Sequence, residues 1–468
     1  MSGFPRRTFL RYTLRTITAG ALSRFGAVNA LATSISGDYK ALVCVFLLGG
    51  NDSHNMVIPI QTTGGASGKQ SFADYAAVRP ASGIGLLQSQ LLPITVNGDI
   101  YGLHPSLQNV STIYASGKAA ILANVGNLVQ PTTPALYQAH ALSSDGTLPV
   151  NLMSHSDQQT QWETATPNLL AASGWGGRVA DVFAKSGLPS FPMNVSASDG
   201  SIFAFGTTTF PASIVAFDPS IALPGNYTSG LAQLLAFNNG LQMVQAANQV
   251  TQAGLNQHAV LAQAINALDI PTSQSIQTRF GNLSDPLSAQ LETVAQVIAA
   301  SQMLGVNRQI FFVAQGGYDT HGGESATYAG LLSTLDNALN AFFLVTQDLG
   351  IAGQVTTFTN SEFGRNLQPN GNAGTDHAWG GHHLVLGGAV NGGTMYGTFP
   401  TLQVGGPDAI SADPSGAGIL IPSTPIAAYG ATLARWFGVS PTNGDMVTLF
   451  PTLPNFPSFN AAAGMGFV

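Results

Sequence analysis

The sequence predicts an α/β fold class, with a doubly wound, mostly parallel sheet and helices on both of its faces. Two observations support this prediction. Five short apolar runs end in glycine or in polar loops, as strands buried on both faces of a parallel sheet do. Segments with helical periodicity lie between several of these runs, and this alternation is typical of doubly wound sheets.

The elements follow in chain order. Predicted strands cover residues 41–50, 119–126, 309–317, 354–362 and 383–388, and predicted helices cover residues 105–117, 325–350 and 424–438. The second of these helices ends at Gly350, because glycine is a common helix stop. Residues 229–304 are rich in Ala and Gln and show helical patterns without strands, so we expect a helical insertion that covers one side of the sheet.

Residues 1–32 have the features of a twin-arginine signal peptide. Arg6 and Arg7 precede Phe9 and Leu10, and the Ala-Leu-Ala at residues 30–32 fits a cleavage site of small residues. A chance basic N-terminus is the alternative. We therefore expect one mature domain, residues 33–468, that is exported by the twin-arginine route and is periplasmic or secreted.

The composition excludes some classes of partner. Only 8% of the residues are charged and the net charge is −7, without a basic stripe, so nucleic acid is not an expected partner. No segment of the mature chain reaches 18 uninterrupted apolar residues, so no transmembrane segment is expected there. The single cysteine, Cys44, lies in an apolar run and is expected in the core.

Carboxylates and histidines follow the predicted strands, where open α/β sheets form their sites. They occur in "GGNDSHN", "GGYDTHGG", "NSEFGR" and "GTDHAWGGHH". A lone aspartate after a strand is commonly a turn former or a helix cap. The joint occurrence is the stronger signal, because carboxylate oxygens and imidazole nitrogens are metal ligands. The sequence therefore predicts a site for a divalent metal: zinc, manganese, calcium or magnesium.

The motifs "FLLGGNDSHNMVIP", "SHSDQQTQWE", "GGYDTHGG", "SEFGR" and "GTDHAWGGHHLVLGGAV" together resemble the domain-of-unknown-function family 1501 over nearly the whole mature chain. That family in turn resembles the alkaline phosphatase and sulfatase superfamily. The resemblance implies an alkaline-phosphatase-like sheet and one or two divalent metals. It also implies a nucleophile derived from Ser, Thr or Cys at a helix start, and the hydrolysis of phosphate or sulfate esters.

The resemblance also implies a ligand set. The positions that match are Asp52, Asp319, His321, Glu362, Asp376 and His377. Glu362 and Phe363 stand where the superfamily often has Asp and His, so one nitrogen ligand is missing there. Asp376 and His377 supply that ligand or take the role of the last histidine, and His382 or His383 is spare.

The nucleophile implied by the resemblance falls in the segment 151–165, where Ser154 is the first choice and Ser156 the second. A hydroxyl at a helix start lies at the positive end of the helix dipole, where anions bind. The alternative is that one serine only caps the helix. Arg365, like Arg178, is a candidate for holding the oxyanion by a bidentate contact, although Arg365 could equally pair with Glu362. His155 is a ligand, an orienting group or neither.

Two functions are therefore open. The first is an exported, metal-dependent hydrolase that uses a serine nucleophile on a small-molecule or polymer ester. The second is a non-catalytic envelope protein on the same fold that binds or assembles with a partner protein.

Overall fold

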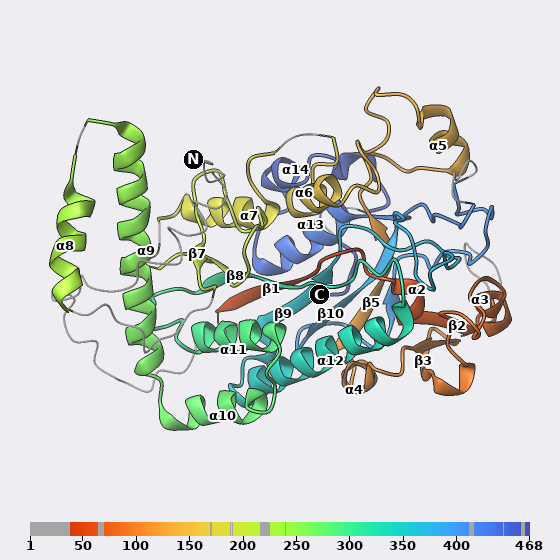
Figure 1. Cartoon of the computed structure of the whole chain (residues 1–468), viewed down its shortest axis with the longest axis horizontal. Coiled ribbons are helices and arrows are strands. Elements are labelled where there is room, and N and C mark those ends of the chain that lie inside the picture. Colours follow the sequence, from red (N-terminus) through yellow and green to blue (C-terminus); the bar gives the residue numbers. More distant parts are fainter. Residues whose placement is uncertain are drawn as a thin grey trace, which may run out of the picture.

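The computed structural model describes residues 38–468, except 64–69, 169–170, 188, 190, 216–224, 239, 411–415, 443 and 460–463. The described residues form a mixed α/β architecture around a nine-stranded sheet (Figure 1). In spatial order the sheet contains β11 (Met395–Tyr396), β5 (Ala119–Gly126), β10 (Gly381–Gly387), β9 (Val355–Asn360), β1 (Lys40–Leu47), β8 (Arg308–Gln315), β6 (Asn194–Ser196) and β7 (Ala212–Ser213). The ninth strand, β12 (Thr424–Pro425), pairs with β5. The five predicted strands coincide with β1, β5, β8, β9 and β10.

The sheet is mostly parallel, with one exception that shapes the site. Strand β1 pairs in parallel with β8 and β9, and β6 continues the parallel pairing beyond β8. Strand β10 runs antiparallel to both β5 and β9. The residues that precede β10 therefore lie at the same edge of the sheet as the residues that follow β1, β8 and β9.

Helices cover both faces of the sheet (Figure 1). Side chains of β1 alternate between two apolar clusters: Val43 and Val45 belong to one, and Leu42, Cys44 and Phe46 belong to the other. The first cluster includes α4 (Gln108–Ala115), α10 (Ile270–Phe280), α11 (Pro286–Ala299) and α12 (Glu324–Asp348). The second includes α6 (His155–Thr164), α7 (Trp175–Ala184), α13 (Ile426–Phe437) and α14 (Asp445–Leu449). Burial on both faces explains why the predicted strands are continuously apolar.

Residues 229–304 contain helices and, where the structure describes them, no strand. The helices are α8 (Gly225–Ala236), α9 (Gln242–Asn266), α10 and α11. Helix α11 packs against β8 beside α12, and α10 packs on α11 and α12, whereas α8 and the first half of α9 project past the sheet edge (Figure 1).

Smaller elements complete the fold. They are a three-stranded sheet of β2 (Val57–Gln61), β4 (Asp99–Leu103) and β3 (Leu92–Val96), and the short helices α2 (Ser53–Met56), α3 (Phe72–Val78) and α5 (Pro134–His140). The expected signal peptide, residues 1–32, lies outside the described residues. Within the described part of the chain, no helix combines the length and hydropathy needed to cross a membrane.

Candidate metal centre

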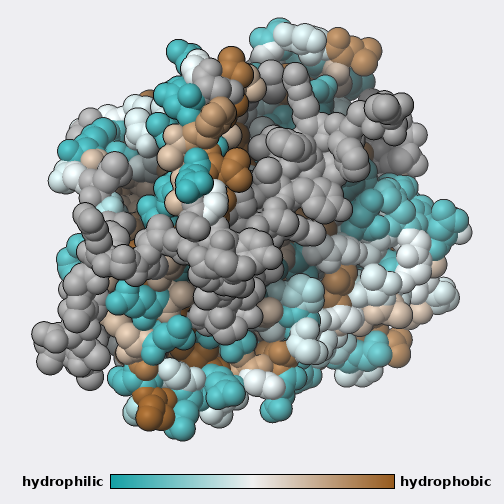
Figure 2. All heavy atoms as spheres, turned by 60° about the vertical axis from the view of Figure 1, so that its left-hand side comes forward, coloured by the Kyte–Doolittle hydropathy of each residue, from teal (hydrophilic) through white to brown (hydrophobic). Residues whose placement is uncertain are grey.

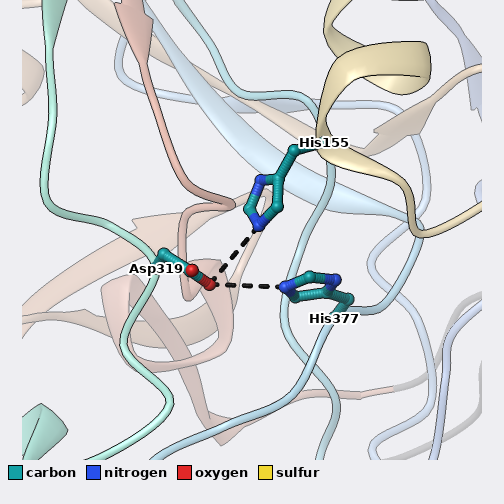
Figure 3. A group of neighbouring side chains, drawn as sticks. All are labelled: His155, Asp319 and His377. Atoms are coloured by element: carbon teal, nitrogen blue, oxygen red, sulfur yellow. Dashed lines mark hydrogen bonds and ion pairs between the residues drawn. The ribbon is translucent and has the colours of Figure 1, made fainter.

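The candidate centre gathers four side chains from three segments at one edge of the sheet. His155 begins α6, Asp319 and His321 follow β8, and His377 precedes the antiparallel β10. Figure 3 shows His155 and His377 directed toward the carboxylate of Asp319. One ligand atom from each of these three residues lies within 4.8 Å of the other two, which is a spacing that a metal ion can bridge.

The Oδ1 atom of Asp319 is the meeting point of three imidazoles. It lies 3.5 Å from Nε2 of His155, 3.3 Å from Nε2 of His377 and 3.1 Å from Nε2 of His321. The Nε2 atoms of His321 and His377 are themselves only 2.9 Å apart. The two nitrogens of His155 and His377 and the carboxylate oxygen of Asp319, with Nε2 of His321 beside them, form a donor set that suits zinc or another borderline divalent ion.

The other ring nitrogen of each imidazole has its own oxygen partner. Nδ1 of His155 lies 2.9 Å from Oε1 of Glu362, and Nδ1 of His321 lies 2.9 Å from Oδ1 of Asp376. Nδ1 of His377 donates to the backbone carbonyl of Met153 at 2.8 Å. Such partners hold a metal-binding histidine in the tautomer that protonates Nδ1 and leaves the Nε2 lone pair free.

This tautomer has an electrostatic consequence. If Nδ1 carries the proton in His321 and His377, their two Nε2 lone pairs face each other at 2.9 Å, beside an anionic oxygen. Lone pairs at this distance repel unless one nitrogen is protonated or a metal cation lies among them. The arrangement therefore fits a divalent metal better than it fits three neutral imidazoles alone.

Arg365 orients the aspartate of the centre. Its Nη2 donates to Oδ1 of Asp319 at 2.5 Å and also to the carbonyls of Gly49 and Tyr318. Its Nε and Nη1 donate to the carbonyls of Gly50 and Thr375. Partial burial works to raise the pKa of Asp319, but the hydrogen bond and charge of Arg365 outweigh it and lower that pKa. The carboxylate is therefore anionic at neutral pH, as a metal ligand must be.

Glycines allow the loops to approach so closely. Gly49 has φ +121°, and a Cβ there would lie 2.3 Å from the backbone nitrogen of Asp319. A Cβ on Gly374 would lie 2.2 Å from the backbone of His321. Any larger residue at either position would displace the loop that carries Asp319 and His321.

Known families support this assembly of motifs. A family model described as "Protein of unknown function (DUF1501)" matches residues 39–408. The chain belongs to the DUF1501 family. No curated protein matches it. Among solved structures it is similar to Ps i-CgsB, once alone (9% identity) and once in complex with k-i-k-neocarrahexaose (8% identity). In both cases the TM-score is 0.32, and the match covers 89% of this chain and 77% of that chain.

In this DUF1501 chain, Glu362 and Asp376 take a different place from the one expected. Glu362 is buried and accepts hydrogen bonds from Gly49 N and His155 Nδ1, and Asp376 lies against His321 Nδ1. Both carboxylates therefore hold histidines instead of facing the centre. His155 brings a nitrogen next to Phe363, whose ring packs against His155 and His377.

Asp52 lies apart from the three imidazoles, inside the core. Its Oδ2 accepts from Nη1 of Arg79 at 2.5 Å, and both side chains are fully buried. The buried carboxyl of Glu324 also lies next to Asp52. Its burial and the negative charge of Asp52 together raise the pKa of Glu324. Asp52 thus faces a guanidinium from α3 and a protonated carboxyl from α12.

Arg365 and Arg178 are not free to bind a substrate. Arg365 is fully buried, and its donors are occupied as described above. Arg178 donates to the carbonyls of Ser173, Thr164 and Leu449. Both guanidiniums therefore tie backbone segments together, which corrects the expectation that they clasp an oxyanion.

Ser154 is the N-cap residue of α6 and directly precedes the candidate ligand His155. Its Oγ donates to Oδ2 of Asp157 at 2.6 Å and lies 3.4 Å from Oγ of Ser156. The preceding Met153 has φ +68°, a rare conformation for a residue other than glycine, and it aims its carbonyl at His377. The spare residues His382 and His383 are buried within β10.

His155 is the residue that sequence reasoning did not place. It lies in a Ser-His-Ser-Asp segment that marks a helix start, and nothing in the local pattern pairs it with Glu362, 207 positions away. The available signal was its position in the chain order between the second and third strands. Burial lowers the pKa of His377, whereas the hydrogen bond to Glu362 raises that of His155.

Proposed function

We propose that this chain is a metal-dependent hydrolase of phosphate or sulfate esters on an alkaline-phosphatase-like, doubly wound fold. The observation that carries the proposal is the set of three imidazoles, each held at Nδ1 by an oxygen, whose Nε2 atoms converge on Oδ1 of Asp319. We assign His155, Asp319 and His377 as ligands, with His321 beside them. Carboxylate–histidine pairs of this kind raise the basicity of ligands and are typical of functional metal sites.

A divalent metal in this centre would supply Lewis acidity to an ester oxygen. The chain's own residues prepare the centre. Arg365 keeps Asp319 anionic, Glu362 and the Met153 carbonyl hold the two ligand rings, and Phe363 packs against both of them. The side chains of Asp319 and His321 are nearly half exposed, at 47% and 44%, so an ester on a large molecule could reach them.

Ser154 is our proposed nucleophile, with Ser156 as the second choice. It lies at the N-terminus of the ten-residue helix α6, one residue before a ligand, and Asp157 already accepts a hydrogen bond from its hydroxyl. A carboxylate in this position can accept the proton when the serine oxygen attacks phosphorus or sulfur. The leaving alkoxide departs from the opposite side of the phosphorus or sulfur atom and takes a proton from water. A second water then cleaves the bond between the serine oxygen and phosphorus or sulfur, which releases the acid and restores the serine.

The proposal includes export. The paired Arg6 and Arg7 and the small residues at 30–32 favour the twin-arginine route to the periplasm or beyond. Replacement of both arginines by lysine should retain the full-length precursor in the cytoplasm, as followed by fractionation and immunoblotting. Unchanged export of that variant would remove the localisation from the proposal.

The test of function combines metal analysis with ester hydrolysis. Purified protein should contain about one equivalent of a divalent metal by inductively coupled plasma mass spectrometry. It should also hydrolyse p-nitrophenyl phosphate or p-nitrophenyl sulfate. His155→Ala should lose both properties, and Ser154→Ala should lose hydrolysis but keep the metal.

His140 offers a matched control. Its Nδ1 lies 2.6 Å from Asp145 in a histidine–carboxylate pair on α5, away from Asp319, so His140→Ala should keep metal and activity. Metal-free protein that takes up no ion on incubation would overturn the centre itself. Metal retention without hydrolysis of any ester would favour the binding protein over the hydrolase.

A further inference from the structure

The hairpin of α8 and α9 has a half that is exposed among the residues that the structure describes. The buried residues of α9 are Leu255, Leu261, Ala264 and Ile265, so all of them lie in its second half. The first half is in contact with α8, where Asn248 donates to the carbonyls of Leu234 and Phe237. Figure 1 shows this part of the hairpin standing clear of the sheet.

An apolar seam runs along the exposed side of α9. Met243, Ala247, Val250 and Gly254 are separated by four, three and four residues, which is the spacing of one face in paired helices. All four are exposed, with Met243 at 86% and Val250 at 71%. On α8, Leu234 is 69% exposed. Figure 2, which turns this side forward, shows hydrophobic side chains among hydrophilic ones on this face.

The hairpin also lacks charge. Between Asp218 and Asp269 the sequence has no Asp, Glu, Lys or Arg, although the chain has 37 such residues in total, 22 acidic and 15 basic. Helices that pair with a different protein commonly choose it through charges that flank the seam. An uncharged seam offers nothing to a charged partner, but it meets no repulsion from a second copy of itself.

The order of large and small residues fits an antiparallel pair. When two α9 helices run antiparallel about a twofold axis between Ala247 and Val250, Met243 of each copy faces Gly254 of the other, and Ala247 faces Val250. Each large side chain then meets a small one, as close packing requires. A Cβ on Gly254 would meet nothing within 4 Å in the single chain, so the space there is open for a partner.

We propose that two copies of this chain associate through the α8–α9 hairpins, with the Met243–Gly254 seams packed antiparallel about a twofold axis. The contact is isologous, so it closes as a dimer. Two hairpins together form a four-helix arrangement, which is a stable way to bury the outer face of a helical pair.

The first test measures mass in solution. Sedimentation equilibrium and light scattering of the full chain at micromolar concentration should give twice the chain mass. Val250→Glu and Gly254→Leu should give the single mass, the first by placing charge in the seam and the second by filling the space for Met243. Gln249→Glu should remain a dimer, because Gln249 is exposed but lies about 100° round the helix from Val250.

The second test fixes the direction of pairing. The native Cys44 is buried, so cysteines added to the seam report on contacts alone. Under mild oxidation, a mixture of Met243→Cys and Gly254→Cys proteins should form a disulfide-linked dimer, and each protein alone should not. Efficient cross-linking of Met243→Cys with itself would indicate parallel pairing and overturn the proposal.

Two further outcomes would also overturn it. One is a wild-type chain that stays monomeric at micromolar concentration. The other is a wild-type monomer that binds zwitterionic lipid vesicles and loses this binding in Val250→Glu, which would assign the seam to a membrane surface. Far-UV circular dichroism of each variant guards against misfolding, and the open space at Gly254 keeps Gly254→Leu compatible with the folded monomer.

Discussion

Asp52 and Asp319 each follow a strand of the central sheet, and the sequence marks both as metal ligands, yet they lie in opposite surroundings. Asp319 is 47% exposed and faces three imidazoles, whereas Asp52 is fully buried and faces the guanidinium of Arg79. The same motif, an aspartate within a glycine-rich turn after a strand, thus faces candidate metal ligands at one place and a buried ion pair at the other. The surroundings of each aspartate depend on which side chains from distant segments of the chain lie next to it.

The largest effect should come from breaking the buried pair. Asp52→Ala leaves the buried Arg79 with only the carboxyl of Glu324 to balance its charge, which should lower the free energy of unfolding by up to about 3–5 kcal/mol. Urea denaturation followed by circular dichroism measures this loss. The metal content per folded molecule should be unchanged, and a loss of metal without a loss of stability would place Asp52 among the ligands after all.

Asp319→Asn should have the opposite effect: a small loss of stability and a large loss of metal binding. The amide oxygen can still accept from Arg365, whose guanidinium also donates to four backbone carbonyls, so the free energy of unfolding should fall by only about 1–2 kcal/mol. Removal of the charge should nevertheless abolish stoichiometric metal binding, as measured by isothermal titration calorimetry. If this variant bound metal like the wild type, the comparison between the two aspartates would fail.

These contrasts show which features of the fold and of the site could be predicted from the sequence and which could not. The strands were predictable because burial on both faces leaves a continuous apolar run, as in "ALVCVFLL" before Asp52. The edge of the sheet was predictable as the place of the site, because parallel strands bring their carboxyl ends together. The antiparallel direction of β10 was not, since a buried strand has the same pattern in either direction.

The assignment of individual residues was harder for a related reason. Glu362 was expected as a ligand, but it accepts from Nδ1 of His155, and only the fold brings these two segments together. The same holds for Arg79, whose helix α3 lies outside every recognised motif and yet determines the surroundings of Asp52. The sequence showed which carboxylates and histidines could contribute to a metal site. Whether each one faces the metal position or positions another side chain depended on contacts between distant segments.

A smaller effect should follow from removing the carboxylates behind the histidines. Glu362→Gln should weaken metal affinity by about 10–100-fold, because such partners orient the ligand and raise its basicity. Asp376→Asn makes the same change at the carboxylate that contacts Nδ1 of His321, so it tests whether His321 is also a ligand. Competition with a chromophoric chelator gives both affinities. An Asp376→Asn affinity equal to the wild type would limit the ligands to His155, Asp319 and His377.

The smallest effect concerns the pH dependence of the metal-free protein. The hydrogen bond to Glu362 raises the pKa of His155 above the 6.5 expected for an unfolded chain. A raised pKa in the folded state stabilises the protein fully below pH 6.5, and this contribution disappears as the pH rises through the folded value. Because His155 is 36% exposed, the gain should be under about 1 kcal/mol.

In Glu362→Gln, the amide oxygen can still accept from Gly49 and from His155, but the charge is lost. Unfolding in urea between pH 5.5 and 8.5, with chelator present, should therefore show the wild type gaining stability over this variant toward acid pH. Parallel curves for the two proteins would mean that the His155–Glu362 contact carries no charge in the absence of metal, and that Glu362 acts on the centre through geometry alone.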